Sequence, residues 1–175
     1  DTRAKLLGLE LKENKKGDDI LICCQHDKSH QWRNQPPMQI YIDRLIHELR
    51  MYTDRKIIIR PHPRCPVDNK LQNYKNVELQ VPKQIANTYD DFDLGFNNIH
   101  AVISYSSNPG IHAVLNGTHA FVGPESLAYP VANKELKNIE NPQIFERNQW
   151  LYDYAYTEWT IEEIAQGLPF SRLTF

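Results

Sequence analysis

The segment 100–117 constrains the fold more than any other part of the chain, and it reads HAVISYSSNPGIHAVLNG. Residues 101–103 predict a short buried strand, which a polar turn follows. Asn108 then occupies the N-cap position of a short helix, with Pro109 first in the helix and Gly117 at its end. A strand, a hydroxyl-rich turn and a helix N-terminus can bind an anion, although the same residues also suit an ordinary connection between a strand and a helix.

Further apolar runs alternate with helical patterns along the chain. Strands are predicted at residues 19–24, 56–60, 76–80 and 120–122. Helices are predicted at residues 4–9, 38–52, 89–97 and 141–156, and a capping box at 160–163 opens a last helix. This order predicts an α/β fold: an open, mostly parallel Rossmann-like sheet with helices on both faces. Ligands of such sheets bind beyond the carboxyl ends of the strands.

A second polar motif, RPHPR, follows the predicted strand 56–60. Its prolines fix φ and stiffen the backbone around His62. Arg60 and Arg64 offer forked N–H donors that suit phosphate, and His62 can donate to a phosphate or to a ribose hydroxyl. A proline-rich turn with a packing histidine is the alternative. Because this motif and the serine turn belong to the same sheet edge, phosphate binding is favoured.

Two more loops belong to this edge. In the first, His26 or Asp27 could act as a general base, and no feature of the sequence chooses between them. Trp32 either stacks on a base or sugar or packs on the next helix. In the second, Glu125 and Ser126 follow the fifth strand and could reach a ribose diol, or they could form an ordinary surface turn.

Composition excludes several classes of function. A net charge of −2 gives no electrostatic basis for general nucleic-acid binding, and no apolar run reaches the ~20 residues that span a membrane. Three cysteines, two of them adjacent, favour reduced thiols and a cytoplasmic location. We predict no metal site, because the first of two candidate sets lacks zinc-site spacing and the second lies at the start of a predicted helix, where acidic residues interact favourably with the dipole. These sets are Cys23, Cys24, His26 and His30, and Asp90, Asp91 and Asp93.

The RPHPR motif and the later strand-SSxxGIxAxxxG-strand unit together resemble the nucleotide-sugar-binding half of GT-B glycosyltransferases. The likeness is to transferases of capsule and surface polysaccharide biosynthesis, including those with CMP-activated donors, and to small phage proteins. It extends from about Asp19 to Gly167, after a polar lead-in of residues 1–18, so residues 19–175 would form the donor-binding domain. The family often has Glu where this chain has His112.

The resemblance implies a glycosyltransferase, or its donor-binding domain, that takes a CMP- or UDP-linked sugar and needs no cofactor. His62 would contact the nucleotide, and Ser106 and Ser107 would hold its phosphate. The expected donor site comprises Arg60, His62, Arg64, Ser106, Ser107, Asn108, Gly110, Glu125 and Ser126. The acceptor is not predicted. A full enzyme of this kind has a second domain, so a separate N-terminal domain or a homodimer would complete the site. The alternative is a non-catalytic module that binds a nucleotide or phosphosugar, or a subunit that docks a partner.

Overall fold

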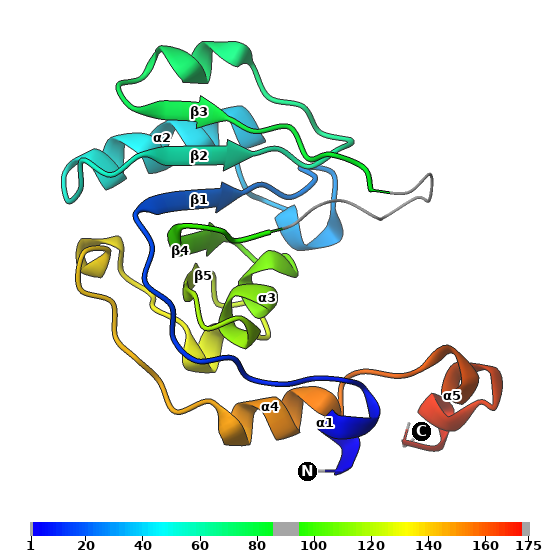
Figure 1. The fold of residues 1–175 in the computed structure, drawn as a ribbon. Helices are drawn as coiled ribbons and strands as arrows, with labels where there is room; N and C mark the ends of the chain where they lie inside the picture. Colours follow the sequence, from blue (N-terminus) through cyan, green and yellow to red (C-terminus); the bar gives the residue numbers. More distant parts are fainter. Residues whose placement is uncertain (1, 86–94, 173–175) are drawn as a thin grey trace. The chain divides into compact units, whose positions relative to one another are not determined.

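The computed structural model describes residues 2–85 and 95–172 (Figure 1). By its internal contacts the chain divides into two compact units. One unit comprises Lys12–Phe145, and the other combines Asp1–Leu11 with Glu146–Phe175. The aspartates Asp90, Asp91 and Asp93 lie outside the described residues, and so does most of the predicted helix at 89–97.

The larger unit contains a sheet of five strands that are all parallel, and this confirms the predicted α/β fold (Figure 1). The strands are β1 (Asp19–Cys23), β2 (Ile57–Arg60), β3 (Val77–Leu79), β4 (Ile99–Ser104) and β5 (His119–Val122). Their order is β3-β2-β1-β4-β5. The chain winds outward in one direction from β1 to β3 and in the other from β4 to β5. The switch point therefore lies between β1 and β4, where open sheets of this type bind ligands.

Helix α2 (Met38–Arg50) covers one face of the sheet, and α3 (Pro109–Leu115) packs on the other (Figure 1). The apolar side of α2 buries Ile42 and Ile46 against alternate strand residues such as Ile57 and Ile59, because side chains alternate between the faces of a strand. Gly110 brings α3 close to the sheet: a Cβ there would lie 2.7 Å from Ser104 Oγ and 2.8 Å from Val122 Cγ1.

The boundaries of α3 confirm the prediction from the segment 100–117. The helix begins at Pro109 and ends before Gly117, which has φ +72°. Asn108 occupies the N-cap position, but its side chain makes no capping hydrogen bond, since its backbone is already helical at φ −52° and ψ −30°. Short 3-10 helices fill the connections: His30–Trp32, Asn69–Asn73, Tyr129–Val131, Leu136–Asn138 and Leu168–Arg172.

The smaller unit contains α1 (Thr2–Leu6), α4 (Asn148–Ala155) and α5 (Ile161–Ala165). Helix α4 begins seven residues later than predicted, because the Glu146 carboxylate accepts the N–H of Asn148 at 2.7 Å and so stabilises the start there. The predicted capping box of Thr160 and Glu163 is present. Arg3 pairs with Glu163 and also donates to the Ala155 carbonyl at 3.1 Å. Among the described residues, no helix has the length and apolar character to cross a membrane.

Candidate functional site

A cavity of about 710 Å³ opens among the loops that follow β1, β2 and β4. We call it the edge cavity. It brings together seven of the predicted site residues: His26, Arg60, His62, Arg64, Ser106, Ser107 and Asn108. These loops are far apart in the sequence, but the parallel sheet places their strands' carboxyl ends at one edge. The cavity lies at the switch point between β1 and β4.

The edge cavity is cationic. Two arginines and two histidines line it, and no carboxylate does so among the residues that the structure describes. The whole chain has a net charge of −2, so this separation of charge is local. A concave surface with cations and no carboxylate raises the local concentration of anions. An anionic ligand therefore suits this cavity.

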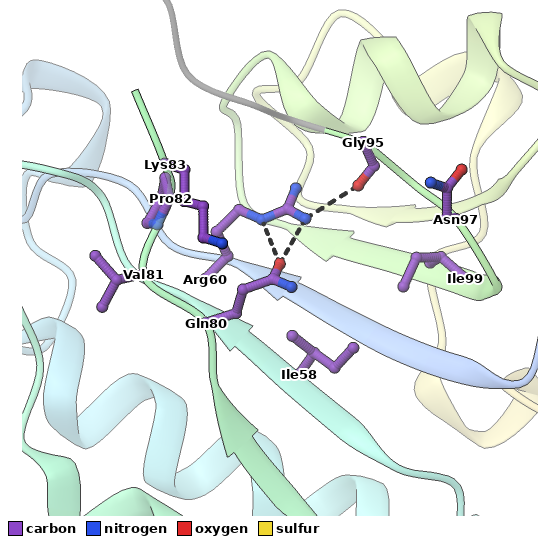
Figure 2. Close-up of a pocket in the computed structure, with 9 residues that line it drawn as sticks. All are labelled: Ile58, Arg60, Gln80, Val81, Pro82, Lys83, Gly95, Asn97 and Ile99. Atoms are coloured by element: carbon purple, nitrogen blue, oxygen red, sulfur yellow. Dashed lines mark hydrogen bonds between the residues drawn. The ribbon is translucent and has the colours of Figure 1, made fainter. Parts of the chain in front are cut away.

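Arg60 is the most buried of these cations, with 7% of its surface exposed. Figure 2 shows its guanidinium beside Gln80 and Gly95: Nε and Nη2 donate to Gln80 Oε1 at 3.1 and 2.8 Å, and Nη2 donates to the Gly95 carbonyl at 3.0 Å. These partners are neutral. Nη1 is buried and has no hydrogen-bond partner within the described part of the chain. A buried cation without a counter-charge is costly, so an anion at Nη1 would be stabilising.

A smaller cavity of about 240 Å³ also borders Arg60 (Figure 2). Its polar lining includes Gln80, Lys83 and Asn97. Arg60 therefore lines both cavities, and the partners of its guanidinium, Gln80 and Gly95, line the smaller one.

The imidazoles of His26 and His62 lie with their ring centroids 5.4 Å apart in an edge-on arrangement. In each ring, Nδ1 accepts a backbone N–H from two residues further on, Lys28 for His26 and Arg64 for His62, both at 3.1 Å. An acceptor at Nδ1 places the proton of a neutral ring on Nε2. Both rings then present an Nε2–H donor, which suits an anion. The role of His26 as a general base remains a prediction.

The serine turn, residues 104–109, is tied to the loop after β1. Gln25 Oε1 accepts from both the N–H and the hydroxyl of Ser106, at 3.1 and 3.2 Å. Gln25 Nε2 donates to Ser29 Oγ at 3.3 Å. Ser107 Oγ is buried but has no partner among the described residues. The two predicted serines therefore differ: both donors of Ser106 are already used, whereas the hydroxyl of Ser107 is available to a ligand.

Four predicted residues do not line the edge cavity: Asp27, Gly110, Glu125 and Ser126. Gly110 belongs to α3 and lies against the sheet, and Ser126 is buried, with its Oγ accepting the Ala128 N–H at 3.2 Å. Glu125 is exposed on the turn after β5. The role of Asp27 as a general base and the assignment of the other three to the donor site remain predictions.

Trp32 packs on the next helix, the second of its two predicted roles. Its indole is 2% exposed and makes an edge-on contact with Tyr41 of α2 at 4.8 Å between centroids. Its Nε1 donates to the Pro36 carbonyl at 2.7 Å. This burial makes Trp32 part of the core.

One cluster offers metal-ligand atoms: His26, Asp27 and Cys65, whose atoms lie within 4.8 Å of one another. The sequence did not suggest this set, because Cys65 is distant along the chain. Zinc binds such ligands at about 2.0–2.3 Å, which draws them closer together than this. His26 Nδ1 also accepts the Lys28 N–H at 3.1 Å, and burial raises the pKa of the Cys65 thiol. The cluster therefore lies where the loops that follow β1 and β2 meet.

The other two cysteines, Cys23 and Cys24, are buried and unpaired. Burial raises the pKa of Cys23 to about 12 and also raises the pKa of Cys24. Both thiols are therefore protonated and poor nucleophiles at neutral pH, although they form part of the cavity wall.

Two site residues were not predicted: Gln25, which positions the serine turn, and Gln80, which holds Arg60. Each stands directly after the last apolar residue of a strand, and this position is the only signal that the sequence offered. The fold and the cavity together define a Rossmann-like α/β domain with a cationic site at its switch point. No protein-family model, curated protein or solved structure matches this chain.

Proposed function

We propose that this protein is a glycosyltransferase, or its donor-binding domain, and that the edge cavity binds the phosphate of a nucleotide-activated sugar. The observation that carries the proposal is the cationic lining of the edge cavity at the switch point of the sheet. The resemblance of the RPHPR and SSxxGIxAxxxG motifs to GT-B transferases gives the reaction class. A CMP- or UDP-linked sugar remains the proposed donor.

In the proposed reaction, the bond between the anomeric carbon and the phosphate oxygen breaks, and the nucleotide leaves with the electron pair. The acceptor hydroxyl forms the new glycosidic bond and loses its proton to a base. Arg60, His62 and Ser107 would stabilise the charge on the departing phosphate, because each can offer a positioned N–H or O–H donor. This half of the reaction needs only residues of the edge cavity.

A thermal-shift screen with CMP, UDP, GDP and their sugar conjugates tests the proposal. A ligand at 100 times its dissociation constant adds about 2.7 kcal/mol of stability. For a chain of 175 residues this corresponds to a Tm increase of roughly 5–10 °C. The proposal predicts such an increase with one nucleotide and its sugar, and no shift with any nucleotide would refute it.

The second candidate is a non-catalytic module that binds a nucleotide or phosphosugar. The absence of a carboxylate from the described lining of the edge cavity favours it, since the acceptor needs a base. Hydrolysis of the bound donor distinguishes the two functions. A transferase releases sugar slowly to water, and His62→Asn reduces this rate. Saturable binding with no release of sugar would favour the module, or a domain whose base comes from a partner.

A further inference from the structure

Ser106 and Ser107 are adjacent, but their polar groups have different environments. The N–H and hydroxyl of Ser106 both donate to Gln25 Oε1, at 3.1 and 3.2 Å. Ser107 lines the edge cavity. Its hydroxyl is buried and has no hydrogen-bond partner in the described ranges. A buried hydroxyl without a partner is unfavourable, and a ligand acceptor at that point would remove the cost.

Gln25 connects the two strands that flank the switch point. It follows β1, is 7% exposed, and reaches Ser106 beyond the end of β4. Its amide nitrogen donates to Ser29 Oγ at 3.3 Å, which fixes which end of the amide faces Ser106. The amide is thus held at both ends, and a buried, held group orders the turn to which it is bonded.

We infer that Gln25 is a positioning residue that gives the two serines separate roles. Through Ser106 it holds the serine turn, and the held turn presents the Ser107 hydroxyl to a phosphate oxygen of the ligand. Ser106 then stabilises the turn and contributes little directly to the affinity for the ligand. The ligand part of this inference rests on the proposed function, whereas the pairing of Gln25 with Ser106 does not.

A double-mutant cycle tests the pairing without any ligand. Tm is measured for Gln25→Ala, Ser106→Ala, Ser107→Ala and the double variant Gln25→Ala/Ser106→Ala. We expect both single variants of the pair to lower Tm by several degrees, and the double variant to be little worse than either. Ser107→Ala should keep or slightly raise the wild-type Tm, because it removes a buried hydroxyl that has no partner within the described part of the chain. Additive losses from Gln25 and Ser106 would overturn the pairing.

The same variants test the ligand part by calorimetry with CMP and UDP. Ser107→Ala should weaken nucleotide binding roughly 2- to 13-fold, as expected for the loss of one neutral hydrogen bond, and Gln25→Ala should weaken it too. In the Gln25→Ala background Ser106→Ala should add nothing, and Ser107→Ala should add less than it does in the wild type, because the turn no longer holds its hydroxyl in position. The reverse pattern, with Ser106 dominant and Ser107 neutral, would overturn the separation of roles.

Two further variants keep the test decisive. Gln25→Glu retains an acceptor for Ser106 and covers the case in which Gln25→Ala fails to fold. This variant should preserve Tm. It should weaken nucleotide binding, because it adds a negative charge to a cationic cavity. Gln72 is exposed and does not line the edge cavity, so Gln72→Ala is the control and should change neither Tm nor affinity. If the wild type binds no nucleotide, the proposed function fails while the ligand-free cycle still decides the pairing.

Discussion

The loops that follow β2 and β4 meet in the edge cavity, yet they are ordered in different ways. In the RPHPR loop the backbone around His62 is held by bonds within the loop: Arg64 N donates to His62 Nδ1, and Cys65 N donates to the His62 carbonyl at 2.9 Å. The serine turn is held from the loop that follows β1, through Gln25. The first loop supplies the charge of Arg60, and the second supplies a neutral hydroxyl. Since charge-assisted hydrogen bonds are roughly twice as strong as neutral ones, the loop after β2 should contribute more to affinity.

Removing the charge of Arg60 should therefore have the largest effect on binding. Arg60→Met keeps much of the buried volume and removes a hydrogen bond from a charged group, which is worth about 1.5–3 kcal/mol. We expect nucleotide affinity to fall roughly 10- to 150-fold in calorimetry. Arg64→Ala, an exposed arginine of the same loop, is the control and should cost less. Equal losses would show that the buried position of Arg60 has no special role.

A steric variant should have the next largest effect, on stability rather than on affinity. Gly110→Ala places a methyl group 2.7 Å from Ser104 Oγ and 2.8 Å from Val122 Cγ1, so either these side chains or α3 itself must shift. Overpacking of this kind costs about 1–3 kcal/mol of unfolding free energy, which denaturant titration measures. His112→Ala changes the exposed side of the same helix and should cost under about 0.5 kcal/mol. A stable Gly110→Ala would contradict the close approach of α3.

His62 gives a smaller test, within the RPHPR loop. In His62→Asn the amide oxygen can still accept the Arg64 N–H, while the Nε2–H donor is lost. The loss of one neutral hydrogen bond is worth about 0.5–1.5 kcal/mol, or roughly 2- to 13-fold in nucleotide affinity. Tm should change little. A large Tm loss with unchanged affinity would assign His62 to packing, the alternative that the sequence left open.

Acid titration should affect a different part of the chain, the smaller unit. The bond from Arg3, together with the backbone N–H of Thr160, lowers the pKa of Glu163 from 4.5 to about 2. The folded pKa is below the unfolded one, so this stabilisation is complete above about pH 4.5 and is lost as pH falls towards 2. Glu163→Gln should remove that part of the acid dependence of unfolding, and Glu162→Gln should not. Identical acid profiles for the two variants would contradict the Arg3–Glu163 pairing.

The sequence predicted the fold well because its apolar runs are short, continuous and separated by clear helical patterns. The ends of α3 followed from Pro109 and Gly117, whose backbone preferences are local. The start of α4 was less predictable, because apolar residues at helical spacing continue before it while Glu146 stabilises a later start. Periodicity reports which side chains can share a face, and it does not report where the first turn is stabilised.

The candidate site was only partly predictable, for a related reason. Arg60, His62 and the serines stand next to strands in recognisable motifs. The roles of Gln25 and Gln80 depend on hydrogen bonds across the sheet edge to residues distant in sequence. The difference between Ser106 and Ser107 also comes from a distant residue, because Gln25 bonds to Ser106 and leaves the Ser107 hydroxyl without a partner among the described residues. Such tertiary pairings leave no local pattern.

The most direct test of phosphate binding in the edge cavity compares nucleotides with their nucleosides. Calorimetry on the wild-type protein would measure the affinity of CMP and cytidine, and of UDP and uridine. Arg60 and Ser107 offer their unpaired donors to phosphate, so the phosphorylated ligand of the pair that binds should do so at least tenfold more tightly than its nucleoside. Arg60→Met should abolish most of that difference. Equal binding of a nucleotide and its nucleoside, or no binding of either nucleotide, would contradict the account.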